Sequence, residues 1–178
     1  MKTYEFTLKF DLQNKDADPE QYVEALGGQG CDDALIGFGK FGSIALTFDR
    51  DAETAHAAIS SAISDIKAVI PKARLCEAGP DLVGLSDIAK AIQCSRQNVR
   101  KLLVTAENAP RPVHGGNPAL WHLADVLKWL KVEKNYEIDE TMLAVAELMM
   151  PLNALKSINR TCSETKEEAM QLVQLAAA

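Results

Sequence analysis

The stretch LSDIAKAIQCSRQNVRKLLV, residues 85–104, decides the fold of the middle of this chain. Two short helices that cross after a tight turn need apolar or small residues at fixed offsets, because each offset faces the other helix. The stretch supplies such residues at Ile88, Ala89, Ile92, Cys94, Val99, Leu102 and Leu103. The spacing predicts a helix-turn-helix.

Two serines and the turn complete this pattern. Ser86 and Ser95 each stand where a helix should begin, so we expect their hydroxyls to accept the free N–H groups there. The turn of such motifs usually carries Gly, which tolerates a left-handed backbone, whereas this chain has Gln93. Gln93 is the one departure from the common pattern.

Charge is unevenly distributed along the 178 residues, whose formal net charge is −6. Residues 1–81 carry a net −6 and residues 135–178 a net −4, whereas residues 82–134 have 8 Lys/Arg against 4 Asp/Glu, a net +4. The local field, not the charge of the whole chain, decides whether a surface attracts phosphates. The one basic segment contains the predicted helix-turn-helix, which favours nucleic-acid binding there.

The second helix of the motif provides the candidate DNA contacts. With Val99 and Leu102 facing inward at 100° per residue, Gln97 and Lys101 point most directly outward. Gln and Asn can pair two ways with adenine and Arg with guanine, while Ser, Lys and a helix N-terminus suit phosphates. The predicted DNA-contacting residues on and beside this helix are Lys90, Ser95, Arg96, Gln97, Asn98, Arg100, Lys101 and Arg111.

Residues 105–131 extend the motif into a larger module. TAENAPRPVHGGNP (105–118) predicts an extended segment with a tight turn, residues 119–122 a short strand, and residues 125–130 a short helix. The span 82–131, with SRQNVRKLL, APRPVHGG and WHLADVLKWL, resembles the winged-helix modules of the MerR superfamily, especially excisionase-like and AlpA-like proteins of phage and mobile elements. The resemblance implies a winged helix-turn-helix domain, residues 82–134, that binds double-stranded DNA.

The tip of the implied wing departs from this family. Relatives often carry Arg there, whereas this chain has His114, Gly115, Gly116 and Asn117. We include these four residues among the candidate DNA contacts, with the expectation that wing contacts are weaker or are made by backbone N–H groups. Trp121 and Trp129 are expected in the core of the module rather than as platforms for stacking bases.

The segments before and after the basic module are predicted to fold as separate units. Residues 1–79 show a β-α-β-β-α-β order, which is typical of the ferredoxin-like fold. Gly37–Gly42 matches GxGxxG but lies between two predicted strands, so we interpret it as a hairpin turn and not as a dinucleotide site. Residues 135–178 predict a helical tail, kinked or divided at Pro151, that either forms a dimer interface or packs on its own chain.

The remaining features narrow the class of protein. The four cysteines form no CxxC pair, so buried free thiols are expected instead of a metal site or a disulfide. The start MKTYEFTLKFDLQ has charges where a signal peptide needs an apolar stretch, which predicts a cytoplasmic protein with no membrane partner. No cofactor motif or nucleophile–base pair stands out, so an enzyme is not expected.

Together these patterns predict an α+β chain with three parts and two candidate functions. The first is a sequence-specific DNA-binding protein, a transcriptional regulator acting as a homodimer on double-stranded DNA, with the N-terminal domain free to receive a protein or small-molecule effector. The alternative is a protein-interaction adaptor, antitoxin-like or from a phage element, whose acidic N-terminal domain binds a protein partner.

Overall fold

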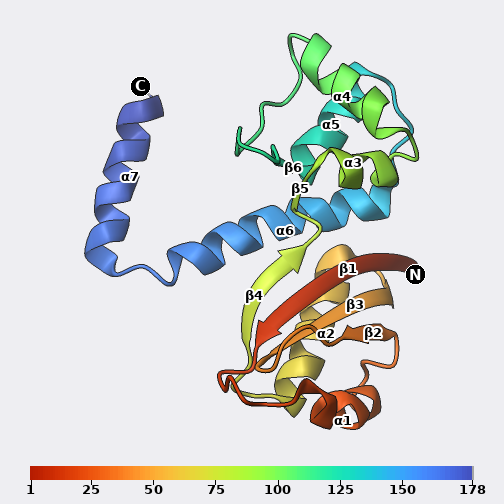
Figure 1. The fold of residues 1–178 in the computed structure, drawn as a ribbon, viewed down its shortest axis with the longest axis vertical. Helices are drawn as coiled ribbons and strands as arrows, with labels where there is room; N and C mark the ends of the chain where they lie inside the picture. The colour runs from red at the N-terminus through yellow and green to blue at the C-terminus, as the bar shows by residue number, and fades with distance from the viewer. Residues whose placement is uncertain (178) are drawn as a thin grey trace.

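The computed structural model, which describes residues 1–177, is a mixed α+β protein with two hydrophobic cores (Figure 1). The first core belongs to a four-stranded antiparallel sheet and the helices on one of its faces. The second belongs to a helical unit with a two-stranded sheet. Helix α6 (Glu140–Ile158) crosses between the two units and contributes side chains to both cores. The predicted α+β class is confirmed.

The larger sheet contains strands β1 (Lys2–Asp11), β2 (Ala34–Gly37), β3 (Ser43–Ala52) and β4 (Arg74–Gly79), in the order β2-β3-β1-β4. A 3-10 turn (Pro19–Tyr22) and α1 (Val23–Gly28) connect β1 to β2, and α2 (Ala55–Val69) connects β3 to β4. This is the element order that the sequence predicts. The loop 37–42 joins β2 to β3, so the GxGxxG match is a hairpin turn.

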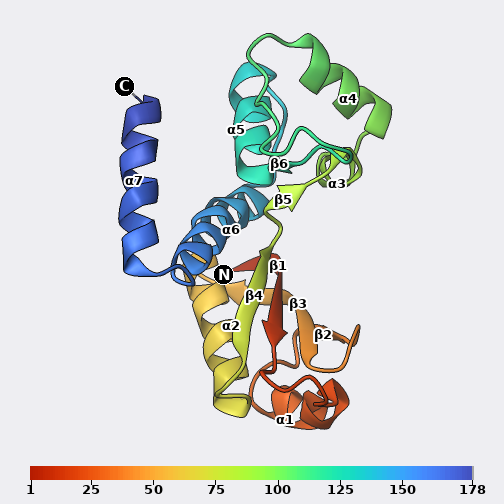
Figure 2. The same ribbon diagram turned by 60° about the vertical axis from the view of Figure 1, so that its left-hand side comes forward.

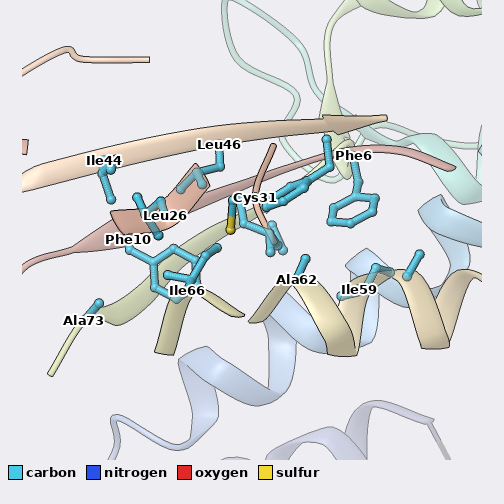
Figure 3. Close-up of a cluster of buried hydrophobic side chains, with 14 of the residues drawn as sticks. Phe6, Phe10, Leu26, Cys31, Ile44, Leu46, Ile59, Ala62, Ile66 and Ala73 are labelled. Carbon is cyan, nitrogen blue, oxygen red and sulfur yellow. The ribbon is translucent and has the colours of Figure 1, made fainter. Parts of the chain in front are cut away.

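Buried apolar side chains alternate with more exposed ones along the central strands, and the buried ones form the first core. Figure 3 shows side chains of the sheet, among them Phe6 and Leu46, facing Ile59 and Ile66 of α2. Helix α2 begins after Thr54, whose hydroxyl accepts a hydrogen bond from the N–H of Ala57 at 3.1 Å. The helix cannot begin earlier, because β3 continues through residue 52, paired with the start of β1.

Arg50 closes one end of this core with a buried ion-pair network. Its guanidinium donates two hydrogen bonds to the carboxylate of Asp33, at 2.8 and 2.9 Å, and one to Asp65 at 2.7 Å. Hydrogen bonding to Asp33 raises the pKa of Arg50 against the opposing effect of burial. The network joins β3 to α2 and to the segment before β2, because the three residues come from those three places.

The second unit contains two helices joined by a tight turn, at the place where the spacing in residues 85–104 predicts them. It consists of β5 (Leu82–Val83), α3 (Leu85–Ala91), α4 (Arg96–Thr105), β6 (Trp121–His122) and α5 (Leu123–Glu133), and β5 pairs antiparallel with β6. Its core combines one apolar face from each helix, with Ile88, Val99, Val126 and Leu127 at most 1% exposed. The predicted helix at 125–130 is longer than expected, because its apolar face begins at Leu123.

The buried apolar residues of helix α6 lie in the part of the helix before Pro151, where they pack on their own chain, whereas Leu155 and Ile158 near its end are exposed. Val145 and Met149 are fully buried in the first core, and Ala146 is fully buried in the second. The helix runs through Pro151 without division. Helix α7 (Ser163–Ala177) follows and stands away from both units in two views (Figures 1 and 2).

A polar junction fixes the helix-turn-helix unit to the sheet unit. Asp81, in the connection between β4 and β5, is only 7% exposed. Its carboxylate accepts a hydrogen bond from Nδ2 of Asn153 on α6 at 2.8 Å and lies 2.6 Å from Nδ1 of His122 on β6. One buried carboxylate therefore connects the linker, the small sheet and α6.

The cysteines differ in exposure. All four are free thiols, but only Cys31 is buried, where burial raises the pKa of its thiol to about 11. Cys76 and Cys94 are partly exposed and Cys162 is exposed, so the prediction of buried thiols is wrong for these three, which lie at a sheet edge, in a turn and in the connection between α6 and α7. Within residues 1–177, no helix is long and apolar enough to cross a membrane, and no group of three or more His, Cys, Asp or Glu side chains is placed to hold a metal ion.

Candidate nucleic-acid interface

The turn between α3 and α4 is closed by two backbone hydrogen bonds. The N–H of Cys94 donates to the carbonyl of Ala89 at 2.9 Å, and the N–H of Gln93 donates to that of Lys90 at 3.2 Å. These are the bonds of a Schellman helix end, which requires a left-handed residue at the position that Gln93 occupies. Gln93 has φ +50°, so it takes the conformation that Gly usually supplies.

Only one of the two predicted serine caps exists. Ser95 begins α4, and its hydroxyl accepts a hydrogen bond from the N–H of Asn98 at 3.1 Å. The prediction for Ser86 is wrong, because the residue that precedes α3 is Gly84, two residues earlier, and the helix begins at Leu85. The N–H of Gly84 instead donates to the carboxylate of Asp87 at 3.0 Å.

Helix α4 presents its polar side chains to solvent. Val99 is 1% exposed and anchors the helix in the second core, with Leu102 and Leu103 partly buried beside it. The helix lies at the end of the molecule opposite the large sheet, with its outer side uncovered (Figures 1 and 2). The exposed residues of this helix include all five that the sequence selected: Arg96, Gln97, Asn98, Arg100 and Lys101.

Ion pairing divides the basic residues of this unit into two groups. On α5, the ammonium of Lys128 lies 2.9 Å from the carboxylate of Glu147, and that of Lys131 lies 2.6 Å from Glu140, both on α6. Lys134, directly after α5, has no ion pair either, but its ammonium lies 5.3 Å from the centre of the Trp129 ring. The remaining five form the second group and have no ion pair within residues 1–177: Lys90, Arg96, Arg100, Lys101 and Arg111. We call this group the free cations. They lie on α3, on α4 and on the loop that follows α4.

Two tryptophans position the loop between α4 and β6. The indole N–H of Trp121 donates to the carbonyl of Pro110 at 3.1 Å, and that of Trp129 donates to Oδ1 of Asn108 at 3.3 Å. Both rings are buried, 7% and 8% exposed, so their prediction as core residues is confirmed. Sequence reasoning missed Asn108, because a loop Asn shows no pattern that reveals a partner 21 residues away.

The loop then turns back as a short hairpin. The N–H of Val113 donates to the carbonyl of Leu120 at 2.8 Å, and the N–H of Leu120 donates to His114 at 3.0 Å. Residues 114–117 form the exposed tip of this hairpin. The His114 ring lies against Gly116, where a Cβ would collide with it, so the tip accommodates the imidazole because residue 116 is Gly.

The loop also brings together two residues that are distant in sequence. Arg100 of α4 and Arg111 of the loop line one hollow of about 410 Å³, together with Trp121, Glu107 and apolar residues of both segments. Lys90 lies on the last turn of α3, beside the turn into α4. The candidate residues therefore occupy one continuous part of the second unit: the end of α3, the outer side of α4, and the loop.

Chemically, this surface can attract phosphates with its free cations and offer base edges the amides of Gln97 and Asn98. The N-terminus of α4 adds unpaired N–H groups next to Ser95. Comparisons of the chain with models of protein families, with curated proteins and with solved structures find no match. Any assignment of function therefore depends on this surface.

Proposed function

We propose that this chain is a sequence-specific double-stranded DNA-binding protein, a transcriptional regulator that inserts α4 into the major groove. One observation carries the proposal: five cations without ion-pair partners in the described residues surround an exposed second helix of a helix-turn-helix. A solvated basic face on a helix is common, but here Lys128 and Lys131 are neutralised by α6 and Lys134 lies over the Trp129 ring, whereas these five have no ion pair in the described residues. That selectivity favours a surface kept free for phosphates.

The proposed contacts follow from where the side chains lie on α4. Gln97 and Lys101 are four residues apart and share its outermost face, so they would meet base edges. Arg96 and Arg100 flank that face, and with Lys90 and Arg111 they would hold phosphates on both sides. The wing tip, residues 114–117, would approach the neighbouring backbone through its N–H groups and His114.

The arrangement of the two units supports the finer domain assignment. The strand order β2-β3-β1-β4 with helices on one face is that of a ferredoxin-like domain. The helix pair, the hairpin at His114 and the small sheet correspond to a winged helix-turn-helix. We propose these assignments for residues 1–79 and 82–134, with residues 135–178 connecting two copies into a dimer whose reading helices lie about 34 Å apart.

The test begins with selection of bound sequences from a random duplex pool, followed by mobility-shift titration on the selected site. The double variant Gln97→Ala/Lys101→Ala should lose specific binding by 10-fold or more while its far-UV circular dichroism stays unchanged. The matched control is Gln171→Ala/Lys128→Ala, which removes the same groups from α7 and α5. Undiminished binding by the α4 variant would show that α4 does not read DNA.

A protein-interaction adaptor is the second candidate, and a separate observation favours it. The acidic N-terminal unit exposes three large apolar side chains on β2 and its hairpin: Leu35 is 77% exposed, Phe38 46% and Phe41 67%. Such a cluster is typical of a protein-binding surface. If folded protein binds no duplex at any salt concentration, this function replaces DNA binding.

A further inference from the structure

Helix α7 exposes large apolar side chains, and within residues 1–177 none of them is buried against another element. Met170, Leu172 and Val173 are 63%, 66% and 68% exposed. At 100° per residue these three fall on one half of the helix together with Ala169, Ala176 and one charged residue, Lys166, while Glu164, Gln171, Gln174 and one apolar residue, Leu175, occupy the opposite half. A 15-residue helix that exposes a mainly apolar half to water is typical of a segment that packs against another surface.

A groove of matching character lies at the far end of α6. It has a volume of about 620 Å³ and runs between the start of β4 and the last turns of α6. Leu75, Leu152 and Leu155 form its apolar lining. Leu152, Leu155 and Asn159 are spaced at three and four residues, so one side of the groove is a single helix face suited to a second helix.

The rims of the groove are basic, whereas α7 is acidic. Arg74 lies on the β4 side, and Lys156 and Arg160 lie on the α6 side. On α7, Glu167 and Glu168 border the apolar half on its two sides. Within residues 1–177, none of these five charges takes part in an ion pair.

Two cations lie close together at the α6 rim of the groove, and the negative charges of Glu77 and Asp81 oppose their repulsion only in part. Burial lowers the pKa of Lys156, and the nearby charge of Arg160 lowers it further. Its ammonium donates to the carbonyl of Cys76 and, at 3.0 Å, to Oδ1 of Asn153, which are neutral groups. A carboxylate at this rim would therefore relieve repulsion between two cations.

We propose that α7 of one copy of this chain occupies the β4–α6 groove of a second copy, and that the exchange is reciprocal. The apolar half of α7 packs on Leu75, Leu152 and Leu155, and its glutamates meet Arg74, Lys156 and Arg160. Both copies use the same two surfaces, which is the condition for a closed two-fold dimer. The proposal does not depend on DNA binding.

The position of α7 favours a second copy over the helix's own groove. Within one chain, only residues 159–162 separate α6 from α7. Helix α7 then leads away from the end of α6 and from both units (Figures 1 and 2). The helix thus extends as an arm, and the groove beside it stays open. Reciprocal exchange covers the apolar half of α7 and the β4–α6 groove in both copies. The dimer therefore contains the same contact twice.

The test measures the mass of the full chain by size-exclusion chromatography with light scattering, without DNA. The wild-type chain of 19.4 kDa should elute with twice that mass. Val173→Glu on α7 and Leu155→Glu in the groove should each halve it to the monomer value. Both side chains are more than half exposed, so circular dichroism should show an unchanged fold. Gln171→Glu, on the polar half of α7, is the control and should leave the dimer intact.

Mixing the two defective variants separates exchange from other arrangements. A mixed pair retains one intact contact, because the normal α7 of the Leu155→Glu chain meets the normal groove of the Val173→Glu chain. Dimers should therefore reappear in the mixture alone. A monomeric wild type would overturn the proposal in favour of α7 binding its own groove. A wild-type dimer that Leu155→Glu leaves intact would overturn it in favour of α7 pairing with α7. A mixture without dimers would overturn the contact between α7 of one copy and the groove of the other.

Discussion

The free cations make a quantitative prediction about Lys101. Replacing it with Gln removes one positive charge from the outer face of α4, where no carboxylate neutralises it. Each phosphate neutralised by a protein contributes about −0.9 to the slope of log K against log salt concentration. If all five free cations met phosphates, the slope would be about −4.5 per chain, and Lys101→Gln would bring it to about −3.6. At 0.1 M salt the lost contact would weaken binding by about eightfold.

Lys128→Gln is the matched control for this measurement. It makes the same chemical change and the same change in net charge, but the ammonium of Lys128 lies 2.9 Å from Glu147 on α6. The assay is fluorescence anisotropy on a random-sequence duplex at salt concentrations from 50 to 200 mM, about the range over which counterion release is measured. We expect Lys128→Gln to leave the slope unchanged.

Equal losses in the two variants would refute the reasoning. They would show that the duplex responds to the total charge of the protein and not to a surface on α4. Unchanged slopes in both variants would show that Lys101 meets no phosphate, and a loss in Lys128→Gln alone would place the contact on α5.

Three further predictions concern the fold and the thiols. Gln93→Gly should raise the free energy of unfolding in urea by about 0.5–1 kcal/mol, because Gly adopts the left-handed turn without a steric cost; a decrease would show that the Gln side chain stabilises the turn. Arg50→Ala should lower that free energy by about 3–5 kcal/mol, because two partly buried carboxylates lose their cation. Lys9→Ala, which breaks an exposed pair, should change it by less than about 1 kcal/mol, and equal effects would contradict the comparison. At pH 8, iodoacetamide should modify Cys162 first and Cys31 last, since a hydrogen bond with Thr165 lowers the pKa of the exposed thiol while burial raises that of Cys31 to about 11; mass spectrometry of timed samples would reveal the opposite order.

Most secondary structure could be predicted from the sequence because it depends on neighbours in the chain. The alternation in residues 4–11 shows which side of β1 is buried, and the spacing from Ile88 to Leu103 shows the helix pair. Errors came where two local signals competed. Ser86 is a good cap, but Asp87 supplies a carboxylate to the N–H of Gly84 and moves the helix start.

Pro151 and α6 show what local patterns leave open. A proline within a helix predicts a kink, yet α6 continues because its residues before the proline are buried in two cores. The apolar residues of α6 were equally consistent with a dimer interface or with packing on the chain itself. Which surface covers them depends on contacts with β1, β4 and α5, which no periodicity within α6 can reveal.

The pair of helices α3 and α4 is the feature that the sequence by itself determined most completely, including the turn at Gln93 and the exposed side chains of α4. These features depend on the spacing of apolar residues within twenty positions of the chain, so the sequence pattern is sufficient to predict them. Only the tertiary structure decided which cations of that basic segment are free. Lys128 and Lys131 look like Lys90 and Lys101 in the sequence, but α6 places Glu147 and Glu140 beside the first two. Long-range packing brings those carboxylates to α5, and this packing leaves the positive charge on α3, α4 and the loop.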